Sequence, residues 1–178
     1  MKNNLNVFWS PVGCEKKVVG TDGKPIKVGD PAIVIARDTH KDCSFMYDPY
    51  VVRAINHGVL VVENLKYIES VSVLKLGEQK DESPNTLWRG IHPSLIEAMG
   101  INLSKNGVNQ NIGRESYKSE RFAVGDKVRL MGITLPHGKP DNSWKGRAFT
   151  IKAIDHPYAV VTFVNPEGYN KSNLFVNM

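Results

Sequence analysis

Cysteine, long apolar runs and secretion signals are scarce or missing in this chain. Two cysteines, Cys14 and Cys43, do not provide the disulfide framework of a small secreted domain, so we expect a reduced, cytoplasmic protein. The longest apolar runs have four or five residues, which is far too short for a membrane span. The first residues, MKNNLNVFWSPVG, lack the apolar stretch of a signal peptide.

Catalytic and metal-binding patterns are missing as well. The sequence has no GxxxxGK[ST] phosphate loop, no GxSxG nucleophile elbow and no HExxH motif. His40 and Cys43 have HxxC spacing, and Cys14 and His57 are further ligand candidates, but no second close pair completes a zinc site. We therefore expect no enzyme activity, no metal and no other cofactor. A hydrolase with scattered carboxylates is the alternative.

The main positive feature is an internal repeat without gaps. Residues 51–63, VVRAINHGVLVVE, recur in degenerate form as residues 150–162, TIKAIDHPYAVVT. A second shared motif precedes each copy, IKVGDPAIVI at 26–35 and FAVGDKVRL at 122–130. Self-similarity of this kind indicates one supersecondary unit used twice, here a small β module. The paired histidines, His57 and His156, are then expected to occupy a structural turn.

The repeat divides the chain into four expected parts. They are an N-terminal extension with a hairpin (1–25), a first barrel (26–76), a connector (77–121) and a second barrel (122–178). The Asp22-Gly23 turn signal predicts the hairpin.

Apolar and alternating runs predict the strands. They are expected at 32–35, 50–55 and 59–62, and again at 127–130, 148–154, 159–164 and 174–176, with closing strands or a helical turn at 65–68 and 71–76. His92-Pro93 and Gly100 are typical of the start and end of a short helix at 93–99. Residues 103–119 are polar and are expected to be exposed and mobile.

Each module reads as a Val-Gly-Asp turn, a strand, a long loop, a strand, a tight turn, a strand and a closing strand. This order resembles SH3-like barrels, in particular the KOW-type modules of ribosomal proteins and transcription elongation factors. The words KVGDPAIVI and AVGDKVRL carry the resemblance, and Lys145-Gly146 is similar to the lysine–glycine step of KOW modules. The first module departs from the pattern, because Asp48-Pro49 stands where that step is expected.

The resemblance implies a mainly β fold of two small SH3-like barrels that binds RNA, DNA, a ribosome or RNA polymerase. Charge points the same way, since the formal net charge is +5 and the pI is near 9.2. The excess of Lys and Arg lies in residues 1–80 and 122–178, whereas 81–121 is neutral. A positive field suits a polyanionic partner, although solubility alone is the simpler explanation.

Four basic clusters are candidate contact surfaces for phosphates. The first is in the longer loop of the second module, where Trp144 could stack on a base. The four clusters are Lys139, Trp144, Lys145 and Arg147; Arg37, Lys41 and Arg53; Lys16, Lys17, Lys24 and Lys27; and, as a connector tether, Lys105, Arg114, Lys118 and Arg121. The alternative is that Trp144 packs at a barrel edge, that the lysines protect a hairpin edge, and that the other charges are only solvated.

The function expected from the sequence is therefore non-enzymatic nucleic-acid binding. We expect duplex DNA to be favoured over RNA, with weak sequence preference, as in a phage-encoded nucleoid-associated or transcription-modifying factor. The alternative is a protein-interaction module that docks on RNA polymerase, a ribosome or a virion component.

Overall fold

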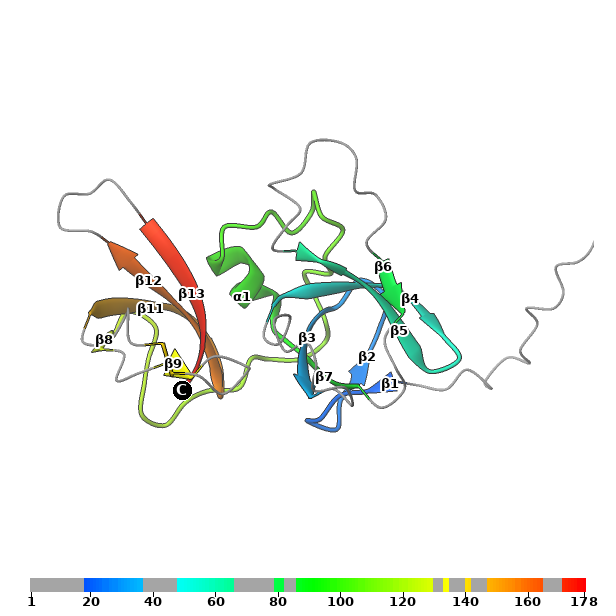
Figure 1. The fold of residues 1–178 in the computed structure, drawn as a ribbon, viewed down its shortest axis with the longest axis horizontal. Helices are drawn as coiled ribbons and strands as arrows, with labels where there is room; N and C mark the ends of the chain where they lie inside the picture. The colour runs from blue at the N-terminus through cyan, green and yellow to red at the C-terminus, as the bar shows by residue number, and fades with distance from the viewer. Residues whose placement is uncertain are drawn as a thin grey trace, which may run out of the picture.

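The computed structural model describes residues 18–36, 48–65, 79–81, 86–129, 133–134, 140–141, 147–164 and 171–178. Within these residues the fold is mainly β, as expected, and contains one short helix (Figure 1). The elements are β1 (Val18–Val19), β2 (Pro25–Ile26), β3 (Pro31–Ala36), β4 (Tyr50–Asn56), β5 (Val59–Asn64), β6 (Gln79–Asp81), β7 (Leu87–Gly90), α1 (Pro93–Ala98), β8 (Lys127–Arg129), β9 (Ile133–Thr134), β10 (Pro140–Asp141), β11 (Ala148–Asp155), β12 (Tyr158–Val164) and β13 (Lys171–Asn177).

Two antiparallel sheets dominate the described structure. The first sheet has the order β6-β5-β4-β3-β7 and the second has the order β13-β12-β11-β8. The strand pairs β1–β2 and β9–β10 form two smaller sheets. In Figure 1 the second sheet lies at the left, the first at the right, and α1 stands between them. No helix within the described ranges is long and apolar enough to cross a membrane.

The repeated segments, residues 51–63 and 150–162, form the same hairpin twice. The pairs of β4 with β5 and of β11 with β12 have equivalent registers, and both contain a β-bulge at the same place. The unpaired residue of the bulge is Arg53 in the first copy and Lys152 in the second. The tight turns begin at His57 and His156, and both residues are exposed, so the predicted turn positions are confirmed.

The Val-Gly-Asp motifs form a second repeated feature. Each is a turn that the side chain of its own aspartate stabilises through a hydrogen bond. In each copy the carboxylate accepts a hydrogen bond of 2.9 Å from the backbone N–H three residues earlier, at Asp30 and at Asp126. The preceding glycine has a positive φ, 89° at Gly29 and 96° at Gly125. Only glycine adopts this conformation without strain, which explains why the word recurs.

The two glycines make a matched test of this turn. A Cβ at Gly29 would lie 2.6 Å from the side chain of Asn109, whereas a Cβ at Gly125 would meet nothing within 4 Å. We expect Gly125→Ala to lower the free energy of unfolding by about 1–2 kcal/mol through the positive φ. Gly29→Ala should cost about 1–3 kcal/mol more because it also overpacks Asn109. Urea denaturation of both variants measures the difference, and equal losses would contradict the Asn109 contact.

The helix α1 begins and ends where the sequence predicts. His92 caps it, and its ring Nδ1 accepts a hydrogen bond from the Ser94 N–H at 3.2 Å. Gly100, with φ of 87°, follows the last turn. Leu95 and Ile96 are fully buried and form the apolar face of the helix.

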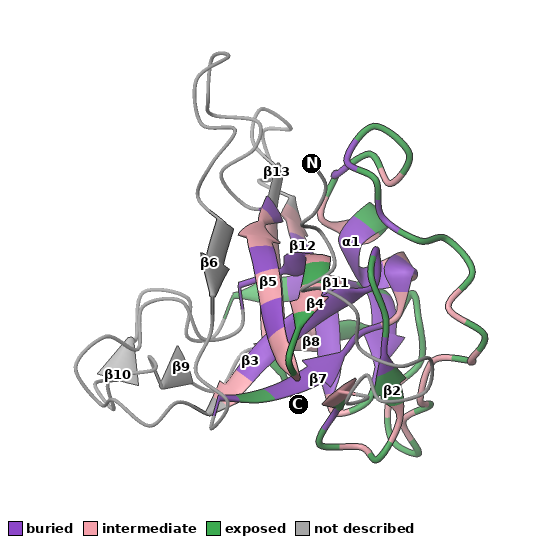
Figure 2. Cartoon of the chain, turned by 90° about the vertical axis from the view of Figure 1, so that its right-hand side faces the viewer, coloured by how far each residue is buried: buried purple, intermediate pink, exposed green. Residues whose placement is uncertain are grey.

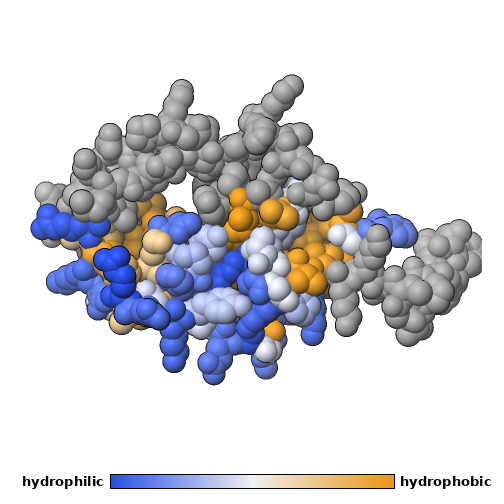
Figure 3. All heavy atoms as spheres, turned by 90° about the horizontal axis from the view of Figure 1, so that it is seen from below, coloured by the Kyte–Doolittle hydropathy of each residue, from blue (hydrophilic) through white to orange (hydrophobic). Residues whose placement is uncertain are grey.

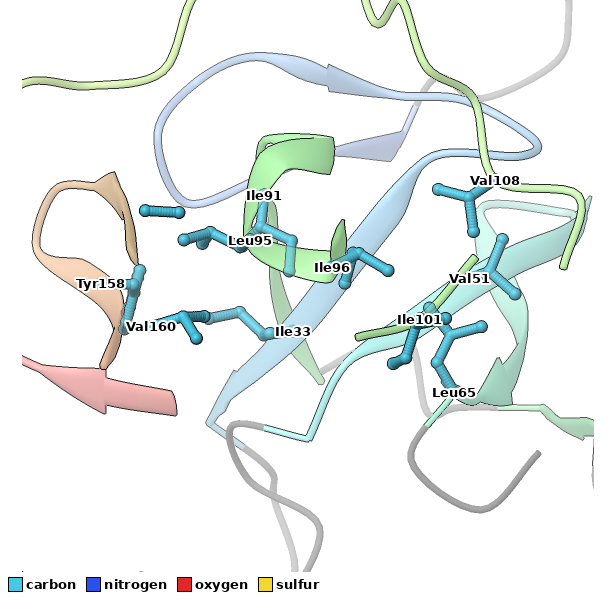
Figure 4. Packing of buried hydrophobic residues seen from close by; sticks show 11 residues of the cluster. Ile33, Val51, Leu65, Ile91, Leu95, Ile96, Ile101, Val108, Tyr158 and Val160 are labelled. Atoms are coloured by element: carbon cyan, nitrogen blue, oxygen red, sulfur yellow. The ribbon is translucent and has the colours of Figure 1, made fainter. Parts of the chain in front are cut away.

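A single central core joins the two copies. Figure 4 shows Leu95 of α1 toward Tyr158 and Val160 of the second sheet, and Ile96 toward Val51 of the first. The buried members of this central core are Ile33, Val51, Leu65, Ile91, Leu95, Ile96, Ile101, Val108, Ala153, Tyr158 and Val160. Figure 2 shows the burial concentrated along β3, β4 and α1. Each sheet therefore has one face toward this shared layer and one toward a core of its own.

The connector takes part in this packing more than its composition indicates. Although most of 103–119 is exposed, Val108 belongs to the central core and Asn106 is also buried. Asn109 donates hydrogen bonds through its side chain to the Val28 carbonyl at 2.9 Å and to Asp30 at 3.0 Å. The expectation that this segment is exposed therefore holds for most of it and fails at Asn106 and Val108.

Candidate nucleic-acid interface

Some of the predicted contact residues form ion pairs with carboxylates of the same chain. Arg53 forms an ion pair of 2.6 Å with Glu63, and Arg114 forms one of 2.5 Å with Asp22. Arg114 also donates to the Gly90 carbonyl, which ties the connector to β7. Because these guanidinium groups are neutralised by carboxylates, the structure does not support them as phosphate ligands.

A buried charge cluster lies where the connector, β7 and the second sheet meet. The carboxylate of Asp155 accepts hydrogen bonds from Arg89 Nη2 at 3.1 Å, from the His92 N–H at 2.9 Å and from the Tyr117 N–H at 2.8 Å. The Arg89 guanidinium lies 5.1 Å from the ring centroid of Tyr117 and 5.0 Å from that of Tyr158. This cluster holds three parts of the chain together and is too buried to contact a polyanion.

The N-terminal hairpin is part of the first module rather than a projecting ribbon. The Thr21 N–H donates to the Trp88 carbonyl at 2.8 Å, and Ile26 is buried in the core of the first sheet. The Lys24 ammonium lies 4.9 Å from the ring centroid of Tyr117, so this predicted contact residue packs on the connector. Lys27 is exposed.

Seven predicted contact residues lie outside the described part of the chain. They are Lys16, Lys17, Arg37, Lys41, Lys139, Trp144 and Lys145. Arg147 is described and exposed, and its guanidinium lies 5.4 Å from the ring centroid of Phe163. In the connector, Lys105, Lys118 and Arg121 are exposed. His40, Cys43 and Cys14 also lie outside the described ranges.

The face of the second sheet that is turned toward the central core has two unlike halves. Near the β11–β12 turn it is apolar, and α1 and the first sheet cover it through Ala153, Tyr158 and Val160. Farther along, the strand pairing aligns Lys127 with Thr150, and Thr150 with Thr162. Residues paired directly across antiparallel strands share a face, so this half is polar.

We call the polar half the basic face. It consists of Lys127, Arg129, Lys152, Thr150, Thr162 and Asn173, and its three basic residues are exposed. Neither Lys127 nor Lys152 forms an ion pair with any residue that the structure describes. Figure 3, seen from below, shows that much of the described surface in that view is hydrophilic, with separate apolar patches.

Comparison of the two bulges explains why Lys152 differs from its counterpart. In the first copy Arg53 is neutralised by Glu63 on the neighbouring strand. The residue equivalent to Glu63 in the second copy is Thr162, which leaves Lys152 without a carboxylate at that place. The substitution is visible in the aligned repeats, but only the shared bulge shows that the two side chains are neighbours.

An open cleft of ≈ 430 Å³ borders the basic face. Residues of α1 form one wall, and residues of β11, β12 and β13 form the other. The lining residues are Ser94, Glu97, Ala98, Lys152, Ala153, Thr162 and Asn173. The Thr162 hydroxyl donates to Asn173 Oδ1 at 2.8 Å, so the two polar strand residues form one unit. Sequence reasoning missed this cleft because its walls are about 60 positions apart in the chain.

Metal binding finds no support in the described residues. They contain no group of three or more histidine, cysteine, aspartate or glutamate side chains that could hold an ion. The carboxylates of the interior are occupied by ion pairs and turns, as at Asp22, Asp30 and Asp155.

Comparisons with known proteins provide no family for this chain: no protein-family model, no curated protein and no solved structure matches it.

Proposed function

We propose that this protein is a non-enzymatic nucleic-acid-binding protein and that the basic face is its contact surface. The observation that carries the proposal is that the second copy has Lys152 at the bulge and Thr162 where the first copy has the Arg53–Glu63 ion pair. This difference leaves a positive charge on the sheet face that also exposes Lys127 and Arg129. Lys127 and Lys152, which form no ion pair with any described residue, are exposed cations of the kind that contacts phosphates.

The net positive charge does not come from the arginines in the internal ion pairs. Three arginines, Arg53, Arg89 and Arg114, are matched by carboxylates, so their ion pairs contribute little net charge. Several further Lys and Arg side chains remain exposed around the second sheet. They are Lys118, Arg121, Lys127, Arg129, Arg147 and Lys152. Phosphate contacts of this kind carry no sequence information, which fits the weak sequence preference expected for duplex DNA.

A salt series tests the proposal directly. Anisotropy of a labelled duplex should show affinity that falls linearly on a log–log plot as salt rises, with a slope of about −0.9 per phosphate contacted. The double variant Lys127→Gln/Lys152→Gln removes two expected contacts. Its slope should be shallower by about 1.8, and binding should weaken alike for every duplex sequence.

The matched control is Lys27→Gln/Lys105→Gln, which removes two exposed lysines that do not belong to the basic face. This control should leave the slope close to that of the unmodified protein. If both double variants change the slope equally, charge matters but the basic face is not the contact. Absence of duplex binding at about 50 mM salt would overturn the proposed function.

One observation favours the alternative, a protein-interaction module. A cleft of ≈ 290 Å³ lies between the β1–β2 hairpin, the β4–β5 turn and β7. Val19 and Leu87, which line it, are 55% and 49% exposed. Exposed apolar side chains that line one cleft are typical of protein contact sites. This function becomes the better proposal if the salt series detects no binding.

A further inference from the structure

The cleft beside α1 opens onto the basic face, since Lys152, Thr162 and Asn173 belong to both. Its volume of ≈ 430 Å³ lies within the range of roughly 300–1,000 Å³ that is usual for small-molecule sites. We infer that this cleft receives one unpaired nucleotide of a bound strand and favours bases that carry an exocyclic amine. The inference rests on the proposed function and specifies its ligand.

The hydrogen bond inside the cleft fixes which groups are offered to a ligand. Thr162 Oγ1 donates to Asn173 Oδ1, so the carbonyl end of the amide is occupied. The amide orientation follows from this bond, and the two N–H donors of Asn173 are then left for a ligand. Asn173 therefore provides donors for a ring nitrogen or carbonyl acceptor of a base.

The charged residues of the cleft complement different parts of a nucleotide. Lys152 lies on the strand wall and continues the row of cations on the basic face, where the strand backbone is expected. Glu97 lies on the opposite wall and is exposed. An ionised carboxylate only accepts hydrogen bonds, so it requires a donor from the ligand.

The hydrogen-bonding groups of the bases predict that the cleft prefers cytosine to uracil. Cytosine offers an amine donor and neighbouring acceptors, which match Glu97 and Asn173. Uracil has a carbonyl oxygen at the place of the amine, and this oxygen would face the Glu97 carboxylate. A site built to bind a donor rejects the analogue that lacks it, because the protein group is left unpaired. Ala98 and Ala153 also line the cleft, and their small side chains leave room for a ring.

A nucleotide fits the cleft better than a peptide because of its surroundings. Phosphates on either side of the bound nucleotide would lie along a surface that exposes Lys127 and Arg129. A base in a duplex is paired and stacked, so it cannot enter the cleft. The preference should therefore occur with single strands only.

The test uses deoxycytidine and deoxyuridine 16-mers, which differ only in the base. In anisotropy titrations at one salt concentration, the unmodified protein should bind the cytidine oligomer about tenfold or more tightly, as expected for one hydrogen bond to a charged group. Glu97→Ala should bring their ratio close to one, because the cytidine oligomer loses its hydrogen-bond acceptor and the uridine oligomer no longer faces a carboxylate. The control Glu120→Ala removes an exposed carboxylate outside the cleft and should preserve the ratio.

The outcomes separate this inference from the proposed function. Salt-dependent binding of both oligomers with a ratio near one would overturn the nucleotide site but leave the basic face as the contact. A ratio that survives Glu97→Ala would overturn the role of Glu97 and with it the inference. If neither the duplex nor the oligomers bind, the proposed function itself fails.

Discussion

Replacing Asp155 by alanine is expected to lower the free energy of unfolding by about 3–5 kcal/mol, the usual cost of removing one partner of a buried ion pair. The side chains of Arg89 and Asp155 are 5% and 1% exposed. Without the carboxylate, the Arg89 charge stays buried with no counter-charge, and two backbone N–H groups lose their acceptor. Arg89 Nη1 already has no hydrogen-bond partner among the described residues, so the guanidinium would keep only the 3.2 Å bond from Nη2 to the His156 carbonyl and its contacts with the Tyr117 and Tyr158 rings.

The repeat supplies the control for this variant. Asn56 occupies the position of Asp155 in the first copy, at the end of the equivalent strand, and is exposed. Asn56→Ala should change stability by no more than about 0.5 kcal/mol, as is usual for surface substitutions. Urea denaturation at neutral pH measures both losses. If the two variants lose the same small amount, the buried cluster does not stabilise the fold as argued.

A double variant separates the ion pair from its surroundings. Arg89→Met removes the other charge while it keeps an apolar side chain between the rings of Tyr117 and Tyr158. Arg89→Met/Asp155→Ala should lose less stability than the sum of the two single variants, because no unpaired charge remains. Additive losses would show that the two residues act independently.

The second large effect concerns the independence of the two copies. Residues 122–178, produced alone, are expected not to fold cooperatively. Ala153, Tyr158 and Val160 would lose their cover from α1 and the first sheet, and full burial of a large apolar side chain contributes about 1.5–3 kcal/mol. All three donors to Asp155 also lie outside this fragment. A unit of about 60 residues has little stability to lose.

Amide proton dispersion in NMR spectra measures this outcome. The fragment alone should give a narrow, poorly dispersed spectrum. Mixing it with residues 1–121 should restore dispersion, because the central core and the Asp155 cluster can re-form; this mixture controls for a fragment that is merely damaged or aggregated. A well-dispersed spectrum and a cooperative thermal transition of 122–178 alone would show that the second copy is an independent domain.

Several local features were predictable because short-range chemistry determines them. The Asp22-Gly23 turn, the two tight turns after β4 and β11, and the capped helix α1 all formed where the sequence indicates. Each depends on residues a few positions apart, such as a glycine with positive φ or a side chain that caps a helix. The repeat also predicted equivalent hairpins, since equal patterns of apolar residues place equal registers on one buried face.

The candidate site was less predictable, because side chains distant in sequence form it. Basic residues could be named from the sequence, but their carboxylate partners could not. Arg114 pairs with Asp22 from the N-terminal hairpin, and Arg53 pairs with Glu63 across the strand. Lys127 and Lys152, which were not predicted as contacts, form no such pair among the described residues.

By itself, the sequence determined that one small β module is used twice, where its turns lie and which short segment is helical. These properties follow from periodicity and turn chemistry within a few residues. Only the tertiary structure decided that the two copies share a core around α1, that Asp155 is buried while its counterpart Asn56 is exposed, and which lysines keep an unneutralised charge. Those outcomes depend on which faces meet across the molecule, and a local pattern carries no information about that.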